Sequence, residues 1–151
     1  MSLLEFLKPE AVMPVLKSTS KKQALADISA HAAKLIGRDS SEIYEVLLQR
    51  ERLGSTGIGE GIAIPHGKLP HLDKLFGLVA RLEKPVDFEA MDGMPVDIVF
   101  LLLAPEGAGA DHLKALSQVA RLLRDQEILE QIRSARDGAE IYAVMTALPL
   151  A

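Results

Sequence analysis

The sequence predicts an α/β fold in which a mixed β-sheet is sandwiched by helices, and three observations support this prediction. The nearly continuous apolar run at 96–104 is typical of a central strand that helices cover on both faces. Segments with apolar residues at helical spacing lie before this run and after it. The order of elements, a helix pair, then strands, then more helices, favours a layered arrangement.

Two helices are expected in the first third of the chain. A capping-box spacing that starts at Ser20, followed by apolar residues at helical period, predicts a helix over about 21–36 that Gly37 ends. A second start signal at Asp39 predicts a helix that runs to about Arg52. We expect these two helices to form a hairpin.

The middle of the chain has the composition of strands. The segment 61–65 is short, apolar and partly β-branched, and the longer apolar runs 75–82 and 96–104 are bounded by proline and glycine. The segment 11–16 is expected to be an edge strand because Pro14 interrupts it.

The last part of the chain is expected to be helical. Asp111, Asp125 and Asp137 each precede an apolar stripe at helical spacing, and the last stripe extends to Leu148. We find no repeat, linker or low-complexity tract, so we expect a single domain over residues 1–151.

Composition excludes several classes of function. The chain of 151 residues carries a formal charge of −4, and only 4% of its residues are aromatic, which disfavours a nucleic-acid ligand. It has no cysteine, so disulfides, thiolate metal sites and thiol catalysis are excluded. Neither a secretory signal nor an apolar run of the ~20 residues that span a bilayer is present, and we expect a cytoplasmic protein without membrane insertion.

One histidine stands out as a candidate for chemistry. His66 lies in GSTGIGEGIAIPHGKL, residues 54–69, and is expected in a flexible, glycine-dense loop after a short apolar run. An imidazole nitrogen can carry a phosphoryl group. If the other nitrogen donates to a backbone carbonyl, the tautomer is fixed and the first nitrogen keeps its lone pair for attack. The residues alone leave open that His66 is a turn histidine without a chemical role.

The chain has three further histidines. His112 is expected at a helix start, where it could hydrogen-bond a phosphate in one cleft with His66, or simply end the preceding turn. His71 is expected on a surface loop and His31 on a solvated helix face. A zinc site of His66, His71 and His112 is disfavoured, because the spacing lacks the helical i, i+4 geometry of a metal motif.

Two polar residues beside the glycine segment are candidates for binding phosphate. Arg52 could supply a guanidinium and Ser55 a hydroxyl, with Arg50 as a weaker candidate. Arg52 could instead complement the helix dipole alone. A solvated role is expected for the carboxylates that are spread over turns and strand ends: Glu60, Asp73, Asp87, Glu89, Asp92 and Asp97.

Three common enzyme motifs are missing. The segment from Gly61 to Lys68 is one residue too long for a P-loop and is followed by Leu69 instead of Ser or Thr. The glycines from Gly57 to Gly61 do not have the dinucleotide-binding spacing, and there is no nucleophile elbow. A nucleotide-dependent kinase and a serine hydrolase are therefore unsupported.

A long ordered string of residues resembles one family. It comprises Arg50-Glu51-Arg52, then GSTGIGEGIAIPHGK, then the apolar strand that ends at Pro105, then His112-Leu-Lys-Ala-Leu-Ser117. This string resembles the IIA components of the bacterial phosphoenolpyruvate-dependent phosphotransferase system, of the fructose/mannitol type and its nitrogen-related branch. The resemblance covers nearly the whole chain.

The resemblance implies a fold and a chemistry. The implied fold is that of fructose/mannitol-type IIA proteins, called phosphotransferase/anion transport protein-like. His66 would be phosphorylated on its ε2 nitrogen by a histidine phosphocarrier protein, and His112 would hydrogen-bond the phosphoryl group. Arg52 and Ser55 match positions that line this site, and neither a metal nor another cofactor is implied.

The resemblance leaves three roles open. Because the chain ends soon after Leu148, we expect no fused IIB domain, which favours a regulator that binds unidentified target proteins according to its phosphorylation state. The alternatives are a stand-alone sugar-uptake IIA that passes phosphate to a separate IIB, and a non-catalytic protein-binding module.

Overall fold

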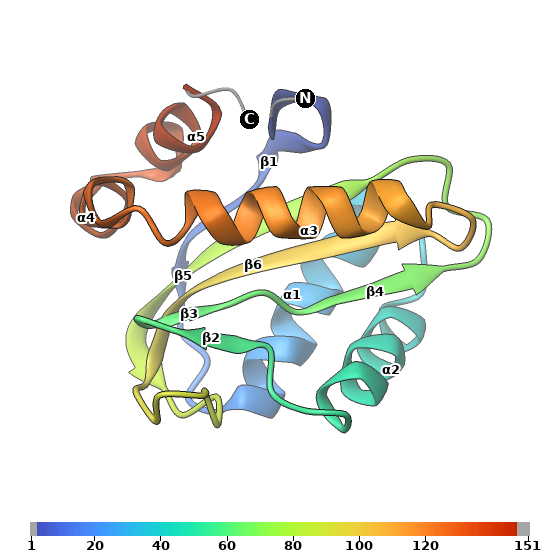
Figure 1. Ribbon diagram of the computed structural model, residues 1–151, viewed down its shortest axis with the longest axis horizontal. Coiled ribbons are helices and arrows are strands. Elements are labelled where there is room, and N and C mark those ends of the chain that lie inside the picture. Colours follow the sequence, from blue (N-terminus) through green and yellow to red (C-terminus); the bar gives the residue numbers. More distant parts are fainter. Residues whose placement is uncertain (1–2, 148–151) are drawn as a thin grey trace.

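The computed structural model describes residues 3–147 and has the expected α/β architecture, with a mixed sheet between layers of helices (Figure 1). The helix that runs the length of the sheet on one face is α3 (Ala110–Leu122). The other face is covered by α1 (Lys21–Ile36) and α2 (Ser40–Glu51). The last two helices, α4 (Gln126–Ser134) and α5 (Gly138–Thr146), lie at the side of the sheet where the chain begins.

The sheet has six strands in the order β1-β5-β6-β3-β2, and β4 also pairs with β6. Only the β5–β6 and β2–β3 pairs are antiparallel; β1–β5, β3–β6 and β4–β6 are parallel. The bounds of the strands are β1 Leu7–Leu16, β2 Gly57–Gly59, β3 Ile62–Ala63, β4 His66–Leu69, β5 Phe76–Val86 and β6 Val96–Pro105. Both β3 and β4 pair with the same edge of β6, one after the other, so the glycine-rich segment is held along this central strand.

Most of the expected helix starts are confirmed by their caps. The side chains of Ser20, Asp39, Asp125 and Asp137 each accept a backbone N–H of the first turn of α1, α2, α4 and α5, respectively. The expected cap at Asp111 is wrong, because α3 begins at Ala110, with Gly109 in the N-cap position and no side-chain cap. The stripe of α5 contains the buried Ile141 and Met145, whereas Leu148 lies outside the described residues.

The strands differ from the prediction mainly at the glycine-rich segment. The apolar run 96–104 is confirmed as the central strand β6, and 11–16 is part of the longer edge strand β1. The expected strand 61–65 is only two residues long, and β2 and β4 were not expected. Because β2 and β4 contain glycine and polar residues, strand propensity gave no signal for them.

A continuous aliphatic core lies between β6 and the helices on its two faces. Residues 98–104 of β6 are fully buried, together with Leu25 and Ile28 of α1 and with Val119 of α3. This burial explains why the run reads as nearly continuous hydrophobic sequence. Within residues 3–147, no helix combines the length and apolar character needed to cross a membrane.

Candidate functional site

His66 is the first residue of β4, so the expectation that it lies in a flexible loop is wrong. It is paired in register with Leu102 of β6, and the Leu102 N–H donates to the carbonyl of Pro65 at 3.0 Å. The ring is therefore attached to the central part of the sheet, and its backbone position is fixed by regular strand pairing.

Close packing of α2 against β4 depends on Gly67. A Cβ at this position would lie 2.3 Å from Cγ1 of Val46, far inside normal contact distance. The absence of a side chain lets α2 approach the strand directly behind His66. Arg50 lies one helical turn after Val46 and is thereby placed beside the imidazole.

Both ring nitrogens of His66 have defined partners. Nδ1 lies 2.8 Å from the carbonyl oxygen of Ile64, which can only accept, so Nδ1 carries the proton and donates it. Nε2 then holds the lone pair and accepts from Nε of Arg50 at 3.3 Å. Arg50 also donates from Nη1 to the carbonyl of Gly54 at 2.9 Å, which anchors the guanidinium at the start of the glycine-rich segment.

The surroundings of His66 favour a neutral ring. Burial lowers the pKa of His66 below its usual value of 6.5, and the charge of Arg50 lowers it further. The hydrogen bond to Ile64 and the carboxylate of Glu51 act in the opposite direction. Because the net pKa shift is downward, the lone pair on Nε2 is available at neutral pH.

His112 lies beside His66, in the first turn of α3. The two ring centroids are 5.7 Å apart, and the ring planes make an angle of 67°. His112 is at the helix start, as expected, but its side chain is buried and only 6% exposed. Its Nε2 is buried and has no hydrogen-bond partner among residues 3–147.

The pKa of His112 is also shifted downward. Burial is the main cause, and the nearby His66 and Lys68 contribute by disfavouring a second positive charge. A neutral imidazole with an unpartnered buried nitrogen can still donate one hydrogen bond to a group that enters the site, or accept one from it.

The structure places Arg52 and Ser55 in contacts that do not involve His66. The Arg52 side chain is 65% exposed, and its nearest charged partner is Glu45 at 3.9 Å. The Ser55 hydroxyl donates to the carbonyl of Phe88 at 2.6 Å and accepts the N–H of Gly57. Ser55 thus fastens the glycine-rich segment to the turn before β6.

Sequence reasoning ranked Arg50 below Arg52, although it is Arg50 that reaches His66. The signal was present, because Arg50 belongs to the same stripe of α2 as Ile43, Val46 and Leu47, which faces the sheet. Glu51 was not among the site residues predicted from the sequence. Its carboxylate is 5% exposed and pairs with Lys21 at 3.0 Å.

The remaining histidines lie elsewhere. His71 is exposed, as expected for a surface loop, and has a positive φ of 62°. His31 is half-buried instead of solvated, because its Nε2 lies 2.8 Å from the carbonyl of Glu10 in β1. Within residues 3–147, no group of three histidine, aspartate or glutamate side chains is arranged to hold a metal ion.

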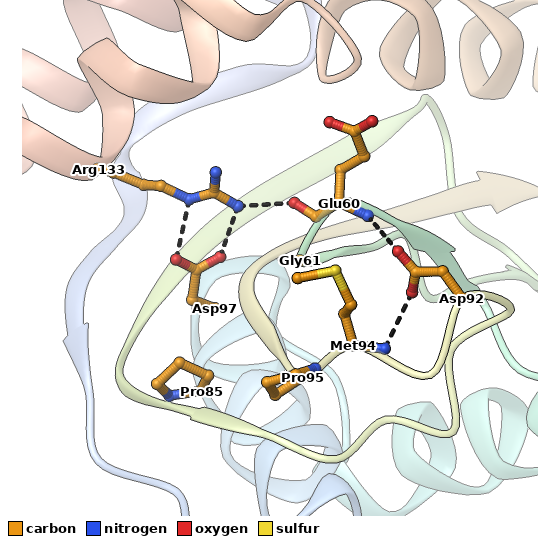
Figure 2. A pocket seen from close by; sticks show the side chains of 8 residues that line it. All are labelled: Glu60, Gly61, Pro85, Asp92, Met94, Pro95, Asp97 and Arg133. Carbon is orange, nitrogen blue, oxygen red and sulfur yellow. Dashed lines mark hydrogen bonds and ion pairs between the residues drawn. The ribbon is translucent and has the colours of Figure 1, made fainter.

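A cavity of about 420 Å³ lies at the other end of β3 and β6, and Figure 2 shows the side chains that line it. Arg133 of α4 donates two hydrogen bonds to Asp97, at 2.9 and 3.0 Å, and a third to the carbonyl of Glu60 at 2.7 Å. Asp92 accepts the N–H groups of Glu60 and Met94. Asp92 is exposed, as expected, and its carboxylate also ties two turns together. A solvated role is wrong for Asp97, which is half-buried and holds α4 against the sheet through Arg133.

The arrangement around His66 suits nucleophilic chemistry on an anionic group. It combines a neutral imidazole, a lone pair on Nε2, an adjacent guanidinium and a second imidazole. A guanidinium stabilises phosphate oxygens by charge-assisted hydrogen bonds. Phosphoryl transfer needs little beyond such positioning and charge stabilisation.

One protein family and several known proteins are similar to this chain. The family model for the phosphoenolpyruvate-dependent sugar phosphotransferase system, EIIA 2, matches residues 5–147. A nitrogen regulatory protein of Bradyrhizobium diazoefficiens is 61% identical over 149 residues, which cover 99% of this chain and 97% of that protein.

Two solved structures are similar in fold. The nitrogen regulatory protein IIA-Ntr from Neisseria meningitidis superposes with a TM-score of 0.90 at 34% identity, covering 96% of this chain and 100% of that one. The mannitol IIA of Escherichia coli gives a TM-score of 0.75 at 22% identity, covering 92% and 98%, respectively. This last likeness concerns the fold alone.

Proposed function

This chain belongs to the EIIA 2 family of the phosphoenolpyruvate-dependent sugar phosphotransferase system, in its nitrogen-regulatory branch, and on that premise we propose that it is a phosphocarrier that accepts a phosphoryl group on His66. The observation that carries the proposal is the pair of contacts on that ring. Nδ1 donates to Ile64, which leaves the lone pair of Nε2 beside Arg50. The proposed unit is a single IIA domain over residues 1–151.

The proposed reaction is a direct transfer between two histidines. The donor is a histidine phosphocarrier protein that carries the phosphoryl group on an imidazole nitrogen. The lone pair of His66 Nε2 attacks phosphorus in line, the N–P bond of the donor breaks, and its electron pair returns to the donor imidazole. No metal or other cofactor enters this step.

Arg50 and His112 are proposed to stabilise the transferred group. The Arg50 guanidinium already touches Nε2, so a short movement brings its N–H groups to the phosphoryl oxygens. His112 has an unpartnered buried nitrogen within one ring contact of His66, which suits a hydrogen bond to the same group. Arg52 and Ser55 would first have to leave Glu45 and Phe88, so we assign the main cationic contact to Arg50.

The proposed output is regulatory. Phosphorylation adds about −1.5 to −2 charges to a surface that carries Arg50 and Lys68, so it cancels most of the positive charge of these two residues. Two exposed apolar side chains, Leu53 and Leu113, lie next in sequence to Arg52 and His112 and are available to a docked protein. Regulated target proteins in the cytoplasm would therefore distinguish the two charge states.

The test is site-mapped mass spectrometry after incubation with phosphoenolpyruvate and the upstream carrier proteins. The wild type should gain one phosphoryl group on His66, and His66→Ala should gain none. His71→Ala is the matched control, since His71 is an exposed histidine only five residues away, and it should be labelled normally. Undiminished labelling of His66→Ala would refute the assignment.

A second arm separates the regulatory role from sugar uptake. Labelled wild type is mixed with a separate IIB protein, and the label on each protein is followed with time. Retention of the label on His66 supports the regulatory role, and rapid transfer to IIB supports a sugar-uptake component.

A further inference from the structure

The carboxylate of Glu51 lies at the centre of a closed set of contacts behind the phosphoryl acceptor. Glu51 is the last residue of α2 and is therefore bonded directly to Arg50. Its Oε1 accepts from Nζ of Lys21 at 3.0 Å and from the backbone N–H of Thr56 at 3.0 Å. Its Oε2 accepts the Thr56 hydroxyl at 2.5 Å. Two donors of one residue and one cation thus fix this carboxylate.

These contacts are largely shielded from solvent. The side chain of Glu51 is 5% exposed, and Thr56 is 3% exposed as a whole residue. A buried carboxylate that is charge-paired and hydrogen-bonded has a single low-energy position, because any other position leaves a polar group without a partner. The position of the Glu51 carboxylate is therefore more restricted than that of the carboxylates in surface ion pairs of this protein.

Thr56 is linked through Ile64 to Nδ1 of His66. The carbonyl of Thr56 accepts the N–H of Ile64 at 3.0 Å, and the carbonyl of Ile64 accepts Nδ1–H of His66 at 2.8 Å. Displacement of Thr56 would move the Ile64 carbonyl, which fixes the tautomer of the acceptor ring.

Glu51 is also linked, through its neighbour Arg50, to the second ring nitrogen of His66, Nε2. Arg50 donates to Nε2 of His66, and it also holds the carbonyl of Gly54, two residues before Thr56. The position of the guanidinium therefore depends on how the end of α2 is attached to residues 54–56. Glu51 makes that attachment.

We propose that Glu51 is a positioning residue for the phosphoryl acceptor: through Thr56 and Ile64 it fixes the proton on Nδ1, and through the end of α2 it holds Arg50 on Nε2. This inference rests on the proposed role of His66 as acceptor. Glu51 touches neither the transferred group nor the ring, so its effect is exerted on tautomer and alignment.

The charge of Glu51 has a related effect. It raises the pKa of His66, whereas Arg50 lowers it, so the two neighbours act in opposite directions on the same ring. Loss of the carboxylate would leave the charge of Arg50 uncompensated at the acceptor.

The test uses Glu51→Gln and the isosteric Thr56→Val, with the tautomer of His66 read by long-range ¹H–¹⁵N NMR. The wild type should show the Nδ1–H form alone, and both variants should show a mixture with the Nε2–H form. The rate of labelling by the phosphorylated carrier should fall roughly tenfold to a hundredfold, as expected for a misaligned nucleophile. Thr56→Ser keeps the hydroxyl and should restore both readouts.

The control is Asp97→Asn, which breaks the ion pair with Arg133 at the other end of the sheet. It should lower the melting temperature without changing the tautomer or the labelling rate. If Glu51→Gln does not fold, Thr56→Val and its serine rescue decide the question.

Two outcomes would overturn the inference. One is folded Glu51→Gln or Thr56→Val with the wild-type tautomer and labelling rate. The other is a loss of labelling in Asp97→Asn equal to that in Thr56→Val, which would indicate general destabilisation. The NMR readout needs no phosphate donor, so a wild type that is never labelled would refute the proposed function while the tautomer still tests the role of Glu51.

Discussion

Replacement of Gly67 by alanine should disturb the site through packing alone. The added Cβ would lie 2.3 Å from Cγ1 of Val46, which is 1.1 Å inside the 3.4 Å at which ordinary contact begins. Valine is stiff at χ1 in a helix, so rotation of its side chain offers little relief. The contact is instead relieved by moving α2 away from β4.

The magnitude follows from that displacement. Overpacking of a well-packed contact costs about 1–3 kcal/mol of unfolding free energy. A shift of α2 by about 1 Å would also stretch the 3.3 Å contact between Arg50 and His66 Nε2 beyond hydrogen-bond distance. We therefore expect Gly67→Ala to lose both stability and labelling rate.

Urea denaturation measures the loss of unfolding free energy in Gly67→Ala, and the time course of phosphoryl labelling measures the loss of labelling rate. The double variant Val46→Ala/Gly67→Ala is the decisive partner, since it removes the clashing methyl groups and should recover part of both losses. Wild-type stability and labelling in Gly67→Ala, or a double variant that merely adds the two single losses, would refute the reasoning.

Two further predictions concern charge. Because the pKa values of His66 and His112 lie below 6.5 in the folded state, the unfolded chain binds more protons, and the free energy of unfolding should fall as the pH drops below about 6.5. The labelling rate should persist below that pH and decline only once His66 is protonated; a decline centred at 6.5 in rate-pH profiles would contradict this. Arg50→Lys should slow labelling at least tenfold, whereas the variant at the exposed residue, Arg52→Lys, should be labelled as fast as the wild type. Equal labelling rates of the two variants would contradict the assignment of the main cationic contact to Arg50.

Local signals were sufficient to predict most of the fold. Ser20, Asp39, Asp125 and Asp137 cap their helices because short polar side chains satisfy free N–H groups, whatever the tertiary context. The run 96–104 predicted a buried central strand because burial on both faces excludes polar residues. Both signals lie within a few residues of sequence.

The prediction failed where long-range contacts decide. His-Gly-Lys-Leu forms β4 only because β6 offers a free edge, and no propensity of those four residues indicates it. The burial of His112 depends on how α3 lies across the sheet, which helical spacing does not specify. The exchange of Arg50 for Arg52 had another cause. A shift of two helical positions turns a side chain by about 200° around the axis, so of the two arginines only Arg50 shares the apolar stripe of α2, and this signal was present in the sequence.

The carbonyl that orients His66 belongs to Ile64, only two residues earlier in the chain. This contact is formed before any donor or target protein arrives, and its geometry is inherited from the strand. In the proposed reaction a docked donor would therefore find the tautomer of His66 already set, and only the Arg50 guanidinium would have to move off Nε2 as phosphorus approaches the ring.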